Sequence, residues 1–136
     1  MNEKEEFSVA AIVYNEDEYL LLKYGLGHWE FVKGHKEENE TDEETILREL
    51  EEETGISDGE ILDGFKEKYD YGFTFNGQRI HKFVNCYLIH VFTKDVKLSY
   101  EHEDYCWLTI HEAIKRVTYD NAKKLLIKAN DFRKLL

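Results

Sequence analysis

A glycine-marked loop that runs into an acidic helix constrains this chain more than any other stretch: GHKEENETDEETILRELEEETGI. Thr41 is a favourable N-cap residue, and Glu44 lies three positions later, which is the spacing of a capping box. Acidic residues fill the first turn, where the helix dipole favours negative charge. Gly55 suits the left-handed residue that ends a helix, and Ile56 could supply the apolar contact of a Schellman motif. These signals predict a helix over residues 42–54.

The two faces of this helix differ. At 100° per residue, one face is apolar and carries Ile46, Leu47 and Leu50. A neighbouring stripe carries glutamates at i, i+3 and i+4: Glu49, Glu52 and Glu53. Like charges at this spacing destabilise a helix by about 0.2–0.5 kcal/mol per pair, so a solvated face would do better with alternating Glu and Lys. Hard divalent ions such as Mg2+ bind carboxylates and also hold substrate phosphates. The stripe therefore indicates a metal site, and a solubilising acidic surface is the alternative.

The spacing of these residues resembles the Nudix box of the Nudix hydrolases. Gly34 is followed after five residues by Glu40, and after seven more by the run RELEEETGI over residues 48–56. Every fixed residue and both apolar positions of the box match. A chain rich in glutamate matches acidic positions easily, but its composition does not place Gly34, Arg48 and Gly55.

The net charge of −11 limits the partners of this 136-residue chain. It argues against binding to duplex nucleic acid, because phosphate contacts need a basic face. The same charge would repel a phosphorylated substrate unless cations reversed the local field, and bound metal ions are often the largest local charges in a site. The acidity therefore favours a metal-dependent enzyme, with Mg2+, Mn2+ or another divalent cation as the cofactor.

The two cysteines and the hydropathy pattern point to the cytosol. Cys86 and Cys106 have no C-x-x-C spacing, so we expect both to be reduced. The sequence has no apolar run of about 18 residues and no basic-then-apolar leader. We predict a cytoplasmic monomer that binds a small-molecule nucleotide and no membrane.

Apolar runs and turn residues divide the rest of the chain. Continuous β-prone runs predict strands over 7–14, 19–24, 28–32, 59–75, 79–92 and 105–108. Asn76-Gly77 is the strongest short-range signal for a hairpin. Thr109 could cap a helix that begins near His111, and Asp120 could cap or interrupt the last helical region.

The resulting order, βββαβββα, predicts an α/β fold in which helices pack on a mixed sheet. The resemblance implies the same architecture, the α/β/α sandwich of the Nudix fold. We see no linker, repeat or low-complexity segment, so we expect residues 1–136 to form a single Nudix hydrolase domain.

The resemblance also implies a chemistry: water attacks a phosphorus atom of a nucleoside diphosphate linked to another group. The positions that match the family's metal ligands are Glu49, Glu52, Glu53 and the Gly34 carbonyl. A glycine suits such a ligand because a bare backbone lets its carbonyl approach an ion closely. Glu49 is also implicated as a base, Arg48 would orient the catalytic glutamate, and Glu40 would hold the loop. The metal would neutralise phosphate charge, orient the water and lower its pKa.

A second stretch narrows the resemblance. SYEHEDYCW, over residues 99–107, fits the pattern S-x-E-H-x-x-Y-x-W of the asymmetrically cleaving diadenosine tetraphosphate hydrolases of the animal and archaeal type. His28-Trp29 followed by Lys33-Gly34-His35 agrees with them as well. Glu101 falls where those enzymes place an extra acid, so we assign it as a metal ligand or general base. Glu103 is the alternative acid, and an acidic surface loop is the alternative interpretation.

Phosphate charge that metal does not cover needs fixed cations. Lys33 flanks the box glycine, and we predict that it binds phosphate. Lys82 falls, by the same resemblance, where these hydrolases carry a phosphate-binding lysine. His28 and His35 could donate to phosphate or to the leaving group, or could instead be structural.

Nucleobases are generally held by aromatic stacking, worth about 1–3 kcal/mol per base. Tyr119 aligns with an aromatic that the resembling hydrolases use for this purpose. Its expected partner on the strand after the hairpin is replaced by Cys86, and the neighbouring Tyr87 is our candidate. Tyr87 would face the other side of the sheet if this register is right. A further departure is Glu38-Asn39 in place of Pro-Gly, where Asn tolerates left-handed backbone angles.

We therefore predict a Mg2+-dependent hydrolase of dinucleoside polyphosphates that converts diadenosine tetraphosphate to ATP and AMP. Another Nudix pyrophosphohydrolase, acting on 5′-triphosphorylated RNA or a nucleoside triphosphate, is the alternative enzyme. The acidic chain disfavours long RNA. A non-catalytic Nudix domain that senses a nucleotide is a third hypothesis, and the intact set of box acids argues against it.

Overall fold

The fold is built on a long first strand, β1 (Lys4–Asn15). A computed structural model describes residues 2–136, apart from the side chain of Leu26. β1 pairs antiparallel with β2 (Glu18–Tyr24) and with β4 (Val32–His35), and it runs parallel to β6 (Gln78–His90). The sheet continues through β3 (Trp29–Glu30) beside β2 and β5 (Glu60–Phe75) beside β6, while β7 (His102–Thr109) also pairs with β2. The predicted mixed sheet is confirmed.

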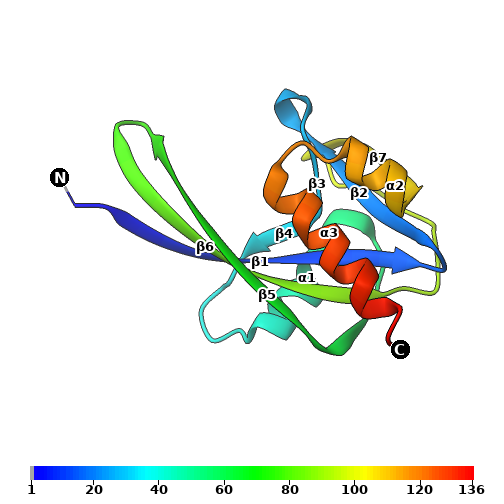
Figure 1. Cartoon of the computed structure of the whole chain (residues 1–136). Coiled ribbons are helices and arrows are strands. Elements are labelled where there is room, and N and C mark those ends of the chain that lie inside the picture. Colours follow the sequence, from blue (N-terminus) through cyan, green and yellow to red (C-terminus); the bar gives the residue numbers. More distant parts are fainter. Residues whose placement is uncertain (1) are drawn as a thin grey trace.

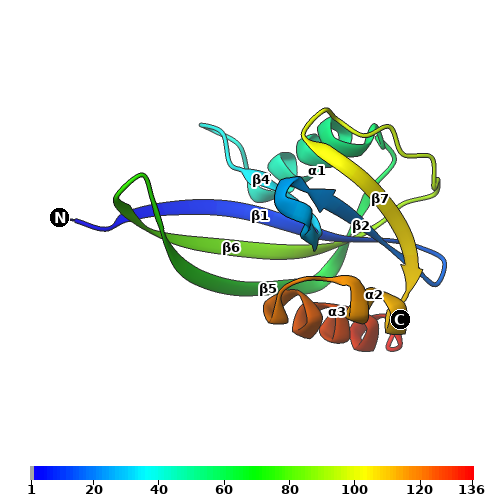
Figure 2. The same cartoon turned by 90° about the horizontal axis from the view of Figure 1, so that it is seen from above.

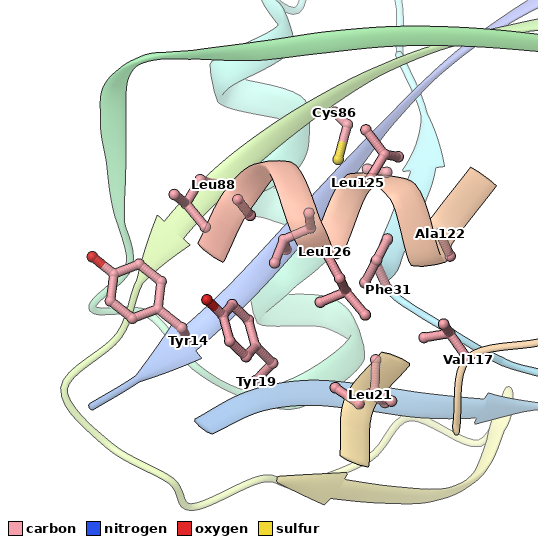
Figure 3. Close-up of a cluster of buried hydrophobic side chains, with 14 of the residues drawn as sticks. Tyr14, Tyr19, Leu21, Phe31, Cys86, Leu88, Val117, Ala122, Leu125 and Leu126 are labelled. Carbon is pink, nitrogen blue, oxygen red and sulfur yellow. The ribbon is translucent and has the colours of Figure 1, made fainter. Parts of the chain in front are cut away.

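Helices cover both faces of this sheet. Figure 2 shows α1 (Asp42–Thr54) on one side and α2 (Ile110–Arg116) with α3 (Asp120–Arg133) on the other. Side chains of β1 alternate between two cores. Val9, Ala11 and Val13 pack in the core of α1, whereas Ala10, Ile12 and Tyr14 pack in the core of α2 and α3. Figure 3 shows part of this second core, where Leu125 and Leu126 of α3 face Cys86 and Leu88 of β6. The predicted α/β/α sandwich is confirmed.

The predicted helix at 42–54 is confirmed at both ends, with one correction. Thr41 and Glu44 form the capping box, and Gly55 is left-handed at φ 76°. The helix does not end in a Schellman motif, because the Ile56 amide donates to Thr54 Oγ1 and only the Gly55 amide returns to the helix, at Glu51 O. This single bond is the simpler left-handed ending. Of the predicted apolar face, Ile46 and Leu50 are fully buried, but Leu47 is 38% exposed.

The third predicted strand is divided. The prediction placed one strand over residues 28–32, whereas β3 ends at Glu30 and β4 begins at Val32. The division arises because β3 pairs with β2 while β4 crosses to pair with β1. A pattern of apolar residues reports burial and not the partner strand, so it does not reveal such a change of partner.

The β5–β6 hairpin is confirmed at Asn76-Gly77, where both residues have positive φ angles of 50° and 77°. Figure 1 shows that this hairpin and the start of β1 extend together beyond the body of the sandwich. Asn39 in the loop before α1 has a φ of 69°, so it takes the left-handed conformation that we expected of it.

The C-terminal helices differ from the prediction in their caps. Thr109 occupies the N-cap position of α2, but its side chain makes no capping hydrogen bond. Asp120 is the first residue of α3 rather than its cap, and Tyr119 is the N-cap residue. Because of this one-residue difference, Tyr119 lies just before the first turn of α3 and not within it.

Two further observations concern the helices and the two cysteines. Within residues 2–136, the helices are too short or too polar to span a bilayer. Both thiols are free, Cys86 in the core and Cys106 part-buried. Burial raises the pKa of the Cys86 thiol to about 12, so this cysteine is protonated and unreactive.

Candidate active site

The carboxylate stripe of α1 spans three different environments. The Glu52 side chain is 57% exposed, that of Glu49 is 15% exposed, and that of Glu53 is 6% exposed. Residues three and four apart share a helix face, so these three environments lie side by side along α1. One carboxylate of the stripe therefore faces solvent and one is enclosed by protein.

Arg48 connects the stripe to the preceding loop through all five of its N–H groups. Nε and Nη2 donate to the two oxygens of Glu40, at 2.6 and 2.9 Å, in a bidentate pair. Nη1 donates to Glu49 Oε1 at 2.9 Å and to Glu52 Oε2 at 3.1 Å. Nη2 also donates to the His35 carbonyl at 3.1 Å. Arg48 thus links Glu40, Glu49 and Glu52 through hydrogen bonds, and its predicted role of orienting a catalytic glutamate stays a prediction.

Glu40 holds the loop to the helix, which is the role we predicted for it. Besides the Arg48 pair, Oε1 accepts from the Thr45 hydroxyl and from the Glu37 amide, each at 2.9 Å. The Arg48 guanidinium, with these further donors, lowers the pKa of Glu40 from its ordinary 4.5 to about 2. The carboxylate is therefore ionised and fully engaged with protein donors, which leaves it unsuited to a metal ion.

Gly34 lies directly beneath the Glu49 carboxylate. It pairs with Val9 across β1 and β4, and a Cβ atom added there would collide with the Cγ, Cδ and Oε1 atoms of Glu49. A side chain at position 34 would therefore displace the Glu49 carboxylate from its place against β4. The sequence had suggested a glycine for access of an ion to the carbonyl, and the structure adds a steric reason that comes from the Glu49 side chain.

Glu53 is enclosed by two side chains from β2 and β7. His102 Nε2 lies 2.8 Å from Glu53 Oε1, and the Tyr24 hydroxyl donates to the same oxygen at 3.4 Å. Glu53 Oε2 is buried and has no hydrogen-bond partner within the described residues. Burial, followed by the neighbouring Glu49 charge, raises the pKa of Glu53 well above its ordinary value. A cation at Oε2 would relieve both the unsatisfied oxygen and the repulsion.

Glu101 lies in the exposed turn just before β7. Its charge contributes to the raised pKa of Glu53, so the two carboxylates are electrostatically close. Glu103, the alternative acid, is paired with Lys23 at 3.7 Å. Glu101 as the further acid of the site therefore stays a prediction, with Glu103 held by Lys23.

These carboxylates have the chemistry of a site for a hard divalent cation. The buried, unsatisfied Oε2 of Glu53 is the observation that fits a metal ion, since buried polar groups are normally paired. Over residues 2–136, however, no three acidic, histidine or cysteine side chains stand close enough together to hold an ion as they are. Arg48 Nη1 donates to both Glu49 and Glu52, so one oxygen of each carboxylate is engaged with protein in this arrangement.

A cleft of about 480 Å³ opens on the α3 side of the sheet. Its lining residues are His28, Glu30, Lys33, Tyr69, Tyr71, Phe73, Tyr119, Asn121 and Ala122. The cleft brings together three of the predicted substrate-binding residues: His28, Lys33 and Tyr119. It is mostly apolar with a few polar groups at one end, which is the usual composition of a site for a small organic ligand.

The aromatic wall of this cleft was not predicted. Tyr69, Tyr71 and Phe73 lie on one face of β5, with ring centroids 6.2 and 5.9 Å apart along the row. Tyr119 also lines the cleft, with its ring centroid 5.6 Å from that of His28. The alternation Y-x-Y-x-F in the sequence is the signal that could have identified this wall, since alternate residues of a strand share a face.

The cationic end of the cleft is only partly free. Lys33 Nζ lies 2.9 Å from the buried Glu30 carboxylate, and His28 Nε2 lies 4.0 Å from the same oxygen. Lys82 lies on β6 opposite Tyr71 of β5. Burial, followed by the charge of Lys33, lowers the pKa of Lys82, so the two lysines are near each other. Glu30 is a residue of this site that the sequence analysis missed.

Three predicted substrate-binding residues are not part of the lining of the cleft: Lys82, which lies near Lys33, and Tyr87 and His35. Tyr87 is buried in the core of α1, on the other side of the sheet, and its hydroxyl donates to Asp42 Oδ2 at 2.7 Å. Tyr87 therefore cannot complete a base clamp with Tyr119, and the alternation of side chains on β6 is the reason. His35 Nδ1 lies 3.3 Å from the Ser8 hydroxyl, outside the lining of the cleft.

Tyr24 joins the cleft to the acidic helix. Its hydroxyl lies 2.6 Å from the Phe31 carbonyl oxygen and 3.4 Å from Glu53 Oε1, two acceptors for its one proton, and its ring stacks on His28 at 5.7 Å. Lys33 Nζ lies 5.8 Å from the centre of the same ring. A phosphate chain bound at Lys33 would therefore extend toward the carboxylates of α1. This arrangement can place a phosphorus atom between fixed cations and a carboxylate cluster.

Comparisons with known proteins agree with this geometry. The NUDIX domain family matches residues 4–129. The chain is 35% identical over 121 residues to the asymmetrical bis(5′-nucleosyl)-tetraphosphatase of Rattus norvegicus, an alignment that covers 85% of this chain and 80% of the relative. The corresponding protein of Sus scrofa is 36% identical over the same coverage. A crystal structure of a C. elegans Ap4A hydrolase binary complex superposes with a TM-score of 0.85 at 28% identity, covering 96% of this chain and 99% of the other.

Proposed function

The chain belongs to the Nudix hydrolase family, and from this premise we propose that it hydrolyses dinucleoside polyphosphates, converting diadenosine tetraphosphate and water to ATP and AMP. The observation that carries this proposal is the connection, through Tyr24, between the carboxylates of α1 and the aromatic cleft. The named activity of the rat and pig relatives supports the same substrate.

Glu53, Glu52, Glu49 and Glu101, with the Gly34 carbonyl, are the groups that we propose to hold divalent metal, Mg2+ in the cell. Such an ion supplies charge neutralisation at the phosphates and a lower pKa for the attacking water. Glu53 would contribute its free Oε2, and Arg48 would keep Glu49 oriented after Glu52 has turned toward the ion. The charge of −11 on the chain supports this assignment, since it otherwise repels the substrate.

Two residues are candidates for the base that accepts the proton of the water. Glu49 is oriented by Arg48 and is mostly covered, which favours a fixed geometry. Glu101 lies in an exposed turn and can approach a bound water without disturbing the helix. In either case, one oxygen of the carboxylate accepts the proton of the water as the new oxygen–phosphorus bond forms. The phosphoanhydride P–O bond between the ATP and AMP parts of the substrate breaks in the same step.

Lys33 and Lys82 would bind the phosphate chain. Lys33 is paired with Glu30 and lines the cleft. Burial, followed by the charge of Lys33, lowers the pKa of Lys82, and a phosphate bound beside it would offset both effects. His28, between Tyr24 and Tyr119, could donate to a phosphate oxygen or to the leaving nucleotide. We propose that His35 contributes less, since its ring faces Ser8.

We propose that a nucleobase stacks between Tyr119 and the wall formed by Tyr69, Tyr71 and Phe73. This wall replaces Tyr87 as the partner of Tyr119. Tyr119→Ala should raise the KM for the dinucleotide by about 5–150-fold, which corresponds to about 1–3 kcal/mol of stacking. Tyr100→Ala is a matched control, because Tyr100 is 96% exposed and lies outside the cleft.

The direct test is to incubate the protein with diadenosine tetraphosphate and Mg2+ and to resolve the products by chromatography. ATP with AMP is the expected result, and two ADP or no turnover would overturn the substrate assignment. Nucleoside triphosphates and 5′-triphosphorylated RNA in the same panel test the alternative reactions. A Glu53→Gln variant tests a purely sensing role, because that role predicts unchanged nucleotide binding and no turnover in either protein.

We propose further that residues 1–136 act as one cytosolic domain and as a monomer. Both thiols are free, which supports a reducing compartment. One chain supplies every group of the site, which supports a monomer. Light scattering of the purified protein measures the oligomeric state, and a dimer would overturn this part of the proposal.

A further inference from the structure

His102 is a buried polar residue that lies beside the acidic helix. Its side chain is 1% exposed, compared with 6% for Glu53, which it contacts. It is the first residue of β7 and pairs with Tyr24 of β2, at the point where the register of the two strands shifts. The reaction described above gives this imidazole no task.

The surroundings of His102 fix the orientation of its ring. The edge of the Tyr24 ring meets the imidazole at 90°, with centroids 4.5 Å apart. The His102 amide donates to the Ser99 carbonyl, and the Ser99 amide donates to the Glu53 carbonyl, each at 3.2 Å. The backbone around His102 is therefore tied to the helix turn that carries Glu53.

The two oxygens of Glu53 have unequal partners. Oε1 lies 2.8 Å from His102 Nε2 and 3.4 Å from the Tyr24 hydroxyl, whereas the buried Oε2 has no partner within residues 2–136. His102 Nδ1 is buried and unpaired as well. A histidine that only fills a core would be expected to satisfy both ring nitrogens. His102 instead makes one side-chain hydrogen bond, to Glu53, whose other oxygen has no partner among the described residues.

We propose that His102 is a positioning residue for Glu53: its Nε2–H occupies Oε1 and thereby directs Oε2 to the divalent cation. The inference rests on the proposed metal-dependent function. Hydrogen-bond partners of metal ligands fix the ligand's orientation, and their loss typically reduces metal affinity or activity by about 10–100-fold. Because Glu101 precedes His102 directly, the same anchor also places the turn that carries Glu101.

Two substitutions of similar length separate the hydrogen bond from the packing. His102→Gln retains an N–H donor near the position of Nε2, whereas His102→Met fills the space without a donor. The primary measurement is Mn2+ binding to the nucleotide-free protein, from the electron paramagnetic resonance signal of the free ion. Mg2+-dependent turnover is measured beside it. His111→Gln is the control for loss of an imidazole, since His111 is exposed on α2.

We expect His102→Met to weaken Mn2+ binding by about 10–100-fold and His102→Gln to remain within about threefold of the unsubstituted protein. In saturating Mg2+, the KM for the nucleotide should change little, because His102 lies outside the cleft lining. Equal Mn2+ affinity in the Met variant would overturn the positioning role. Equal losses in the Met and Gln variants would also overturn it, since they would reflect packing alone.

A measurement on the unsubstituted protein removes any dependence on how the variants fold. ¹⁵N–¹H spectra of the histidine side chains should show that the His102 ring carries a proton on Nε2, and its signals should shift when Mg2+ is added. A proton on Nδ1 alone, or signals that do not shift with Mg2+, would refute the inference. If the protein turns over substrate but His102 fails this test, the proposed function stands and the positioning role of His102 is refuted. If the protein neither binds Mn2+ nor turns over substrate, the proposed function and the positioning role are both refuted.

Discussion

Replacing Arg48 with lysine tests whether a planar, five-donor cation is what organises the catalytic helix. The guanidinium makes two bonds to Glu40, one each to Glu49 and Glu52, and one to the His35 carbonyl. A lysine ammonium keeps the charge but has three donors on a single atom. It can therefore replace at most three of the five bonds, and a single nitrogen cannot reach Glu40 and Glu52 at the same time in the way that the guanidinium does.

The magnitude follows from the bonds that are lost. A hydrogen bond to a charged group contributes about 1.5–3 kcal/mol when it is well protected. The Arg48 side chain is 23% exposed, and solvent screening lowers each of the two lost bonds to about 0.5–1.5 kcal/mol. Arg48→Lys should therefore destabilise the fold by about 1–3 kcal/mol, which lowers the Tm by roughly 3–10 °C at this chain length.

Activity should fall further than this loss of stability explains. A displacement of about 1 Å in a catalytic group can reduce the rate by about 100-fold, and Glu49 loses the bond that orients it. We expect kcat/KM for diadenosine tetraphosphate to fall by about 10–100-fold at 25 °C, where a domain of ordinary stability is still folded. Urea unfolding and steady-state kinetics supply the two numbers. Arg79→Lys is the control, because Arg79 is 56% exposed on the hairpin and should change stability by less than about 0.5 kcal/mol. An Arg48→Lys protein with unchanged stability and kinetics would refute the reasoning.

Three further outcomes follow from the same helix and loop. Gly34→Ala should abolish turnover because the new Cβ collides with the Glu49 carboxylate, whereas Gly25→Ala, which points into open space, should retain it; equal rates would contradict the steric argument. Glu40 has a folded-state pKa of about 2, below its ordinary 4.5, so its stabilising contribution is present above pH 4.5 and is lost as the pH falls toward 2. Thermal unfolding of Glu40→Gln should therefore show a weaker pH dependence in that window, and an unchanged slope would argue against the Arg48 pair as its source. Thr41→Ala should cost about 1 kcal/mol in urea unfolding, with Thr41→Ser nearly neutral, and equal losses in both would exclude the cap as the cause.

The acidic helix was predictable because its signals are local. Thr41, Glu44 and Gly55 each act within one helical turn, so the sequence determines both ends of α1. The spacing of a known motif identified Glu40 as a residue that holds the loop, but its bidentate pair with Arg48 was not predicted. The third strand was not, since the change of partner at Phe31 depends on two other strands that lie elsewhere in the sequence.

The substrate cleft was only partly predictable, for a related reason. Tyr119 and Lys33 were identified by resemblance to known enzymes, and both line the cleft. The aromatic wall on β5 depends on which face of that strand meets α3, and one sequence gives the alternation without naming the face. The prediction for Tyr87 was wrong for the same reason. Adjacent residues of β6 face opposite sides of the sheet, so Tyr87 lies in the core of α1 and not at the cleft.

The parallel pairing of β1 with β6 has a consequence for how the chain acquires its structure. Lys4 to Tyr14 align with Ile80 to His90, so each of these contacts closes a loop of about 76 residues. Contacts of such sequence separation form slowly, and during synthesis β1 must wait for most of the chain to emerge. Until then the apolar run at residues 9–13 lacks its partner and is open to pairing with other chains. The strand on which the mature fold is built is therefore its most vulnerable segment in the nascent chain.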